Sequence, residues 1–284
     1  MKYGQLGKTG IEVSRLCVGC LSFGQPFSDS HMWTLNPEET ETIVRKALDL
    51  GFTFFDTANT YSHGTSEEYL GRAIKNSVSR DKVILATKVY FNEGHLSKKA
   101  IQREIDGSLK RLNTDYVDLY IIHRFDRTTP IEETMEALDG LVKCGKVRAL
   151  GASAMYGYQF YSMQVAAERN GWTKFCSMQN HYNLLYREDE REIIPLCKQE
   201  GVALTPFSPL AAGRLARVEW KSDSPRSQMD RTASQKYDGT QETDYEIVRR
   251  VHETAEKHGA TMTQVAIAWH MAKGMTAPII GATK

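Results

Sequence analysis

The chain has 284 residues, of which 41% are hydrophobic and 25% are charged, and its formal net charge is +1. This composition is typical of a globular protein with enough apolar material for a buried core. Near-neutral charge and dispersed Lys and Arg exclude a general electrostatic attraction to nucleic acid or anionic lipid. No apolar leader and no run of about 18 apolar residues is present, so we expect no membrane span and a cytoplasmic location.

The cysteines argue against a disulfide framework or a metal site. There are five of them, and an odd number in a chain of this size indicates free thiols in a reducing compartment. Cys17 and Cys20 form a C-x-x-C pair, but their segment has the pattern of a strand, on which positions three apart face opposite sides. No second cysteine pair accompanies them, and we therefore expect no bound metal.

The first predicted element is a β-hairpin over residues 3–14, with its turn at Lys8, Thr9 and Gly10. Eight short runs follow that are mostly apolar, as strands covered on both faces are. The eight predicted strands are 16–20, 52–57, 82–88, 117–123, 146–153, 174–179, 202–208 and 277–282. We expect the hairpin to plug the bottom of the barrel that these strands form.

Helix-length amphipathic segments separate the strands. The predicted helices are 37–51, 66–76, 97–113, 130–145, 158–171, 187–201, 244–259 and 261–274. Strands that alternate with helices predict an all-parallel sheet, and eight such strands close an α/β fold of the (β/α)8 TIM-barrel type. We interpret residues 1–284 as one such domain.

Two segments depart from this regular alternation. Residues 214–241 are rich in Ser, Asp, Arg and Gln and follow the seventh strand, which predicts a long loop that is functional or mobile. The sequence ends directly after the eighth strand, where a barrel takes a further helix. We therefore expect a C-terminal helix and tail to be missing from it.

Four polar side chains stand at or just beyond the C-terminal ends of successive predicted strands: Asp56, Tyr61, Lys88 and His123. Active sites of barrels are built at that end. Each residue alone has an ordinary structural role, as a helix cap, a loop aromatic, a surface charge or a core histidine. Together at one mouth they favour a catalytic site, because buried unpaired charges are costly.

These four residues suit acid catalysis on a carbonyl. A tyrosine with a pKa of about 10 is a weak acid at neutral pH, but a neighbouring lysine lowers that pKa, and an aspartate holds the lysine in place. A histidine can hydrogen-bond the same substrate oxygen. Reduction of a carbonyl also needs a source of electrons. The sequence shows no metal-ligand cluster and no nucleophile motif, so we expect a cofactor to supply a hydride.

Several stretches resemble the aldo-keto reductase superfamily. FFDTANTYSHGTSEEYLGRAI is similar to its signature, with an Asp five residues before a Tyr and a Ser-Glu pair that opens a helix. DYVDLYIIHRFD, ALGASAM, SMQNHYNLLYRE, PFSPLAAGRL and PIIGAT resemble its later strands, in order and with correct spacing. Within the superfamily, the long polar segment and the stretch QNHYNLLYR most resemble bacterial reductases related to potassium-channel β subunits and aryl-alcohol dehydrogenases.

The resemblance implies an NADPH-dependent oxidoreductase that reduces small aldehydes or ketones to alcohols, with Tyr61 as the proton donor. It implies that Asp56, Tyr61, Lys88 and His123 form the catalytic tetrad. It further implies cofactor contacts near the ribose, carboxamide, nicotinamide ring, pyrophosphate and adenosine phosphate from Cys20, Leu21, Asp56, Ser153, Gln179, Phe207, Ser208, Leu210, Gly213, Arg214, Gly281, Thr283 and Lys284. The physiological substrate and the oligomeric state stay open.

The chain departs from the family pattern at Ala154, where many relatives have an Asn that adds an amide contact. The family's 2′-phosphate ligands follow position 284, so a preference for NADPH over NADH rests on the resemblance.

Two other functions fit parts of the pattern. One is a non-enzymatic NADPH-binding sensor or channel β-subunit-like module, but those β subunits carry Asn at the position of His123. The other is a sugar-phosphate isomerase or lyase, for which SPLAAGRL would serve as the phosphate loop.

Overall fold

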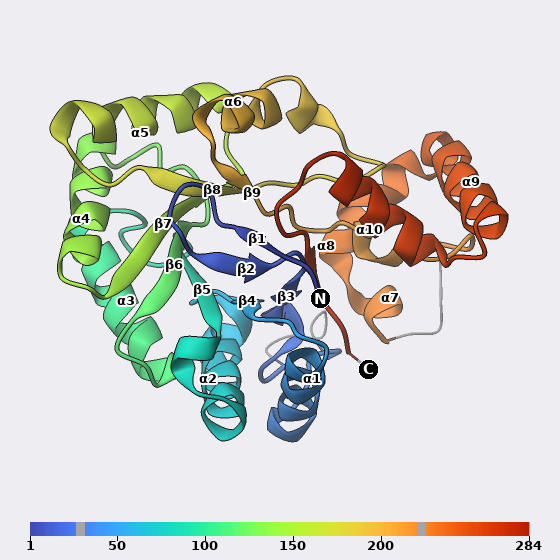
Figure 1. Ribbon diagram of the computed structural model, residues 1–284, viewed down its shortest axis with the longest axis horizontal. Helices are drawn as coiled ribbons and strands as arrows, with labels where there is room; N and C mark the ends of the chain where they lie inside the picture. Colours follow the sequence, from blue (N-terminus) through green and yellow to red (C-terminus); the bar gives the residue numbers. More distant parts are fainter. Residues whose placement is uncertain (27–31, 221–224, 284) are drawn as a thin grey trace.

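The structure, a computed structural model, describes residues 1–26, 32–220 and 225–283. Eight parallel strands form one sheet in the order β10-β3-β4-β5-β6-β7-β8-β9 (Figure 1). Their bounds are β3 (Cys17–Gly19), β4 (Phe54–Asp56), β5 (Ile84–Val89), β6 (Val117–Ile122), β7 (Val147–Ser153), β8 (Phe175–Gln179), β9 (Ala203–Leu204) and β10 (Ile279–Ile280). Each strand lies within its predicted range, except that β5 extends one residue further, which confirms the predicted parallel sheet.

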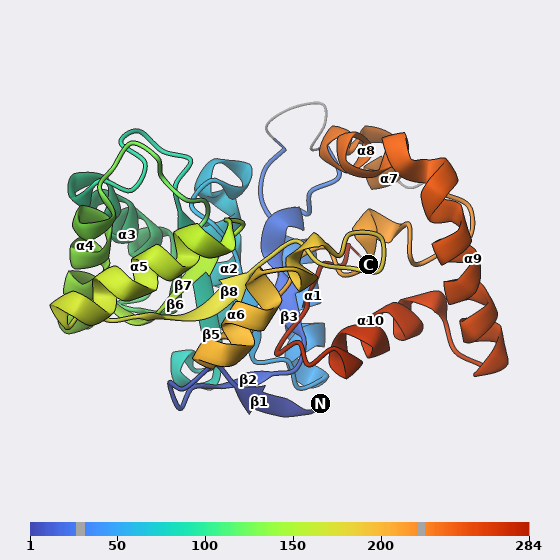
Figure 2. The same cartoon turned by 90° about the horizontal axis from the view of Figure 1, so that it is seen from above.

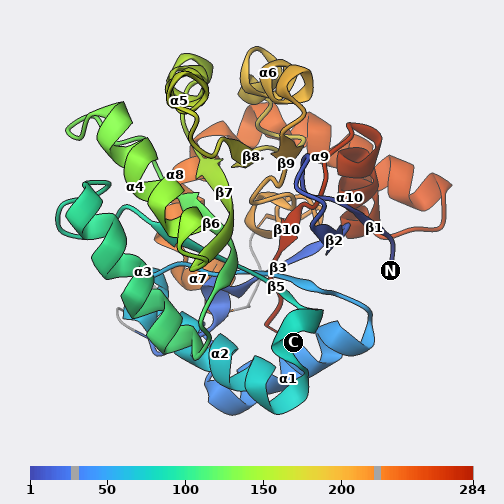
Figure 3. The same cartoon turned by 60° about the vertical axis from the view of Figure 1, so that its left-hand side comes forward.

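The sheet curls until its first and last strands meet. The backbone amides of Thr276 and Ile279 donate to the carbonyls of Leu204 and Pro206, at 2.8 and 2.9 Å. In Figure 3 the strands stand in a ring inside the helices. The arrangement confirms the predicted (β/α)8 barrel.

The predicted N-terminal hairpin is present. Strands β1 (Tyr3–Gln5) and β2 (Glu12–Ser14) pair in antiparallel fashion. Leu6, Ile11 and Val13 are buried and pack against inward-facing barrel side chains. Figure 2 shows this hairpin at the end of the barrel opposite to α7 (Pro225–Met229) and α8 (Arg231–Tyr237). The hairpin therefore closes the bottom and leaves the other end for the site.

Helices cover the outside of the barrel, and most lie where the sequence predicts them. They are α1 (Pro37–Asp49), α2 (Thr65–Ser77), α3 (Lys98–Leu112), α4 (Ile131–Lys143), α5 (Gly157–Asn170), α6 (Ile193–Glu200), α9 (Gln241–Lys257) and α10 (Met262–Ala272). Asn36 caps α1 through its side chain, which accepts from the Glu39 amide, and Pro37 occupies the first turn. None of the helices in the described ranges is long and apolar enough to cross a membrane.

The prediction of one long loop over residues 214–241 is wrong for its second half. Helices α7 and α8 occupy residues 225–237, and the Asp230 side chain caps α8 by accepting from the Ala233 amide at 2.9 Å. Only Ala233 and Tyr237 of α8 are buried. A helix that buries two residues has too little apolar periodicity to be found from its sequence.

Candidate active site

The strands deliver the predicted polar residues to one end of the barrel. Phe54 and Ala86 belong to the inner core, and side chains two positions apart on a strand share a face. Asp56 and Lys88 therefore point into the barrel. In the parallel register Lys88 pairs with Ile121 of β6, and His123 follows that strand directly. The sequence thus brings all three groups to the same mouth.

Lys88 is fully buried and makes three hydrogen bonds. Its ammonium donates to Asp56 Oδ1 at 2.5 Å, to the Thr57 carbonyl at 2.7 Å and to the Tyr61 hydroxyl at 3.2 Å. Gln179 Nε2 donates to the second carboxylate oxygen of Asp56 at 2.8 Å. A buried cation is tolerated when it is paired and hydrogen-bonded in this way. The arrangement holds the ammonium against the phenol.

A tight turn fixes the position of Tyr61. The two residues after it, Ser62 and His63, have φ of 47° and 53°, and Gly64 has φ of 93°. Left-handed backbone at non-glycine residues is strained, and it persists where the surroundings determine it. Thr65 Oγ1 donates to the Ser62 carbonyl at 2.7 Å and thereby ties this turn to the start of α2.

Burial is the largest influence on the pKa values of Tyr61 and His123. Burial raises the pKa of Tyr61 above its ordinary value of 10.0, although the charge and hydrogen bond of Lys88 lower it. The net lowering expected from the sequence is therefore not found, and the phenol is protonated at neutral pH. Burial, followed by the charges of Lys88 and Arg124, holds the pKa of His123 well below 6.5, so its imidazole is neutral.

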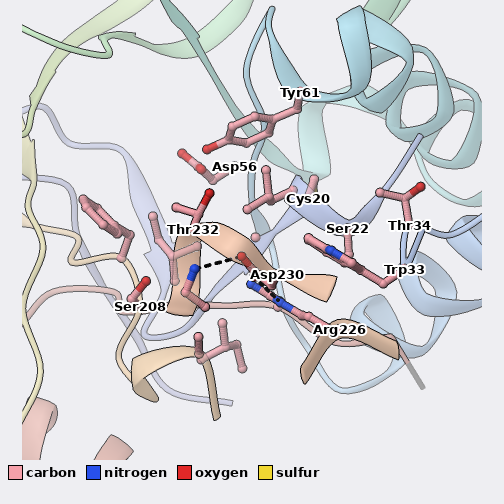
Figure 4. Close-up of a pocket in the computed structure, with 18 of the residues that line it drawn as sticks. Cys20, Ser22, Trp33, Thr34, Asp56, Tyr61, Ser208, Arg226, Asp230 and Thr232 are labelled. Atoms are coloured by element: carbon pink, nitrogen blue, oxygen red, sulfur yellow. Dashed lines mark hydrogen bonds and ion pairs between the residues drawn. The ribbon is translucent and has the colours of Figure 1, made fainter. Parts of the chain in front are cut away.

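Tyr61 and His123 open into a cavity of about 940 Å³ at the barrel mouth. Figure 4 shows Tyr61 next to Asp56 in this cavity, with Arg226 and Asp230 joined by a dashed line elsewhere in it. Most of the cofactor contacts implied by the resemblance also line the cavity: Cys20, Leu21, Asp56, Ser153, Gln179, Phe207, Ser208, Leu210, Gly213, Gly281 and Thr283. Lys88 lies behind Asp56 and Tyr61, while Lys284 lies outside the described residues.

Two features of the cavity fit a nicotinamide cofactor. The hydroxyl of Ser153 is buried and has no hydrogen-bond partner among the described residues, as a group reserved for a ligand amide would be. After β9 the backbone is left-handed at four residues: Ser208, Ala211, Ala212 and Gly213. Three of them, Ser208, Ala212 and Gly213, line the cavity. A Cβ on Gly213 would lie 2.3 Å from Arg217 Nη2.

Phe207 does not present a free ring. His181 stacks on it with centroids 5.1 Å apart and an interplanar angle of 9°. The Lys236 ammonium lies 4.9 Å from the centroid of the same ring. A nicotinamide that stacks on Phe207 must therefore displace one of these contacts, and the flexible Lys236 side chain is the easier one to move.

Arg214 does not line the cavity. Its guanidinium is buried, forms an ion pair with Asp238 and lies over the rings of Trp220 and Tyr237. The resemblance implies a contact of Arg214 with the pyrophosphate, but in this arrangement only its backbone is free to make one.

Two other arginines of the segment after β9 line the cavity instead, Arg217 and Arg226. Arg226 Nη1 lies 3.9 Å from where a Cβ of Gly281 would be, and its Nε pairs with Asp230 at 3.2 Å. The sequence alone does not identify these two arginines, because in the polar segment 214–241 no pattern distinguishes inward-facing from outward-facing side chains. No group of three or more metal-ligating side chains occurs in the described part of the chain.

Comparison with known proteins decides the family. The model of the Aldo/keto reductase family matches residues 15–284. The chain belongs to this family. Versiconal hemiacetal acetate reductase of Aspergillus parasiticus is 42% identical over 99% of this chain and 88% of its own length. An aldo-keto reductase of Fusarium vanettenii is 44% identical over 98% of this chain and 82% of its own.

A putative aryl-alcohol dehydrogenase of Schizosaccharomyces pombe is 40% identical over 99% of this chain and 88% of its own length. The predicted resemblance to aldo-keto reductases and aryl-alcohol dehydrogenases is confirmed, although these three relatives are fungal rather than bacterial. As a member of this aldo/keto reductase family, the protein is an oxidoreductase of carbonyl compounds, and such enzymes generally use nicotinamide cofactors.

Proposed function

We propose that this aldo/keto reductase uses NADPH to reduce small aldehydes or ketones to alcohols, with Tyr61 as the proton donor. The observation that carries the proposal is the contact of the Tyr61 hydroxyl with the buried Lys88–Asp56 pair, at 3.2 Å from the ammonium. The same hydroxyl borders a cavity that His123 also lines, with ring centroids 5.9 Å apart. A carbonyl oxygen that approaches both side chains from the cavity would meet a hydrogen-bond donor on each of them.

The protein's own groups have distinct tasks in this reaction. Bound NADPH supplies the hydride. Tyr61 is protonated at neutral pH and gives its proton to the developing alkoxide. The Lys88 ammonium stabilises the resulting phenolate, because a nearby cation favours the charged form. His123 is neutral, and the tautomer that carries its proton toward the cavity would donate to the carbonyl oxygen and orient it.

We expect NADPH to bind at least ~10-fold more tightly than NADH, because each charge-assisted contact to an extra phosphate is worth a kcal/mol or more. Arg226, which lies against Gly281, is the described cation nearest to the implied adenosine phosphate site. Arg226→Gln should therefore reduce the preference, and Arg231→Gln on the exposed side of α8 should not. Titration of tryptophan fluorescence with both cofactors measures this. Equal affinities in the wild type would contradict the preference.

The alternative is a module that binds NADPH as a sensor or channel β-subunit-like protein without turnover. His123 discriminates between the two, because the resemblance gives such subunits Asn at this position. His123→Asn should leave the fold and NADPH affinity unchanged and lower kcat for carbonyl reduction by about 10²-fold, the scale for losing one oriented donor. Circular dichroism, cofactor titration and steady-state kinetics check the three parts. Unchanged turnover in this variant would remove His123 from the mechanism.

A further inference from the structure

Besides Arg217 and Arg226, two further cationic side chains line the cavity, Arg124 and Lys236. Arg124 directly follows His123, and its Nη1 donates to the His123 carbonyl at 2.9 Å. Its guanidinium lies 5.7 Å from the centroid of Phe91, whose ring meets that of His123 at 5.0 Å. Arg124, Phe91 and His123 therefore form one continuous stretch of the cavity wall, and none of the cofactor contacts implied by the resemblance lies on it.

Neither cation has a carboxylate partner among the residues in the described ranges. The acids that line the cavity are already engaged: Asp56 with Lys88, Asp230 with Arg226, and Glu39 with the amide of Asn36. Burial lowers the pKa of Arg124. Partial burial and the charge of Arg124 lower the pKa of Lys236, and they outweigh the charge of Asp230, which raises it. Two like charges thus line the same partly desolvated cavity, and an anion bound there would relieve their repulsion.

The cofactor phosphates do not account for these charges. Their implied site includes Gly213 and Gly281, and Arg217 and Arg226 already lie against those glycines. Arg124 instead follows β6 and lies beside His123, and Lys236 lies over Phe207, where the resemblance places the nicotinamide ring and no phosphate. Between Arg124 and the catalytic residues the wall is the half-exposed ring of Phe91. The charge is therefore placed for the substrate, and the apolar ring suits a hydrocarbon spacer.

We propose that Arg124 and Lys236 bind a carboxylate of the substrate, so that the preferred substrates are carbonyl compounds carrying a carboxylate on a short apolar or aromatic spacer. This inference rests on the proposed reductase function. Arg124 presents a planar guanidinium suited to a carboxylate, and Lys236 adds a mobile ammonium from α8. Both act as specificity residues, and neither takes part in proton transfer.

The test compares 4-carboxybenzaldehyde with its methyl ester, which has the same carbonyl and no charge. Wild-type kcat/KM should be at least ~10-fold higher for the acid, the scale of one charge-assisted hydrogen bond. Arg124→Gln and Lys236→Gln should each lower kcat/KM for the acid by about 10-fold, mainly through KM, and leave the ester within about twofold. Arg127→Gln, an exposed arginine of the same loop that does not line the cavity, is the matched control.

Equal kcat/KM for acid and ester in the wild type, or equal losses for both in Arg124→Gln, would overturn the proposal. Binding provides a readout that does not need turnover. Calorimetric titration with 4-(hydroxymethyl)benzoate, with and without NADP+, should give tighter binding than its methyl ester, and Arg124→Gln should abolish the difference. If neither aldehyde is reduced but this difference is seen, the proposed reductase function fails and the anion site stands. If the difference is absent, the anion site fails.

Discussion

Replacing Tyr61 with Phe should lower kcat for carbonyl reduction at least ~10²-fold, the usual contribution of a positioned general acid. NADPH affinity should stay nearly unchanged, because Tyr61 is not among the implied cofactor contacts and its hydroxyl contacts Lys88. Loss of kcat with little change in cofactor binding indicates an interaction made in the transition state. Steady-state kinetics with one aldehyde and a parallel cofactor titration measure both quantities.

Tyr245→Phe, which removes an exposed hydroxyl from α9, is the matched control and should behave as wild type. The pH profile of the wild type adds a second check. Because burial holds the pKa of Tyr61 above 10.0, the phenol is protonated throughout the neutral range. We therefore expect kcat to fall only above pH 10. A Tyr61→Phe enzyme with wild-type turnover would remove this residue from the mechanism.

Lys88→Met should cause a comparable loss of turnover and also destabilise the protein. The substitution removes the cation that stabilises the phenolate. Among the described residues, it leaves the buried Asp56 carboxylate with only Gln179 as a side-chain partner. Breaking a buried pair by removing one partner costs about 3–5 kcal/mol of unfolding free energy. Urea denaturation measures this cost, and kinetics measure the loss of turnover.

The stability effect has a defined pH range. Burial lowers the pKa of Lys88, but Asp56 and Tyr61 outweigh it and the net shift is upward from 10.5. A raised folded pKa gives stabilisation that is complete below the unfolded value and is lost as pH rises through the folded one. The deficit of Lys88→Met should thus be constant near neutral pH. Lys98→Met, which removes a surface ion pair with Glu136, should cost less than about 1 kcal/mol. Equal costs for both variants would contradict the buried pair.

The sequence predicted the barrel, and it predicted that Asp56, Tyr61, Lys88 and His123 lie at one mouth, because both depend on local pattern. Apolar runs such as 117–123 and 146–153 allow one structure, and parallel strands bring their C-terminal ends to one mouth. Asp56, Lys88 and His123 were found because each ends a strand or follows it directly. Their meeting is thus a consequence of topology.

What the sequence could not predict depends on side-chain direction and burial. Arg214 stands in the stretch that resembles the family's pyrophosphate site, but its side chain pairs with Asp238. Arg226 lines the cavity from α7, a helix with no apolar pattern. The acidity of Tyr61 was expected to be set by Lys88, yet desolvation outweighs that charge. Arg124 lies beside His123 in the sequence, but only the structure shows that the described acids of the cavity wall are paired with other groups.

The most direct test of the central claim is the oxidation of NADPH by the purified wild-type protein, followed at 340 nm against a panel of aldehydes and ketones. The account predicts carbonyl-dependent oxidation, with one alcohol formed for each NADPH consumed. If NADPH binds but no member of the panel accelerates its oxidation, the reductase proposal is contradicted and the sensor alternative is favoured.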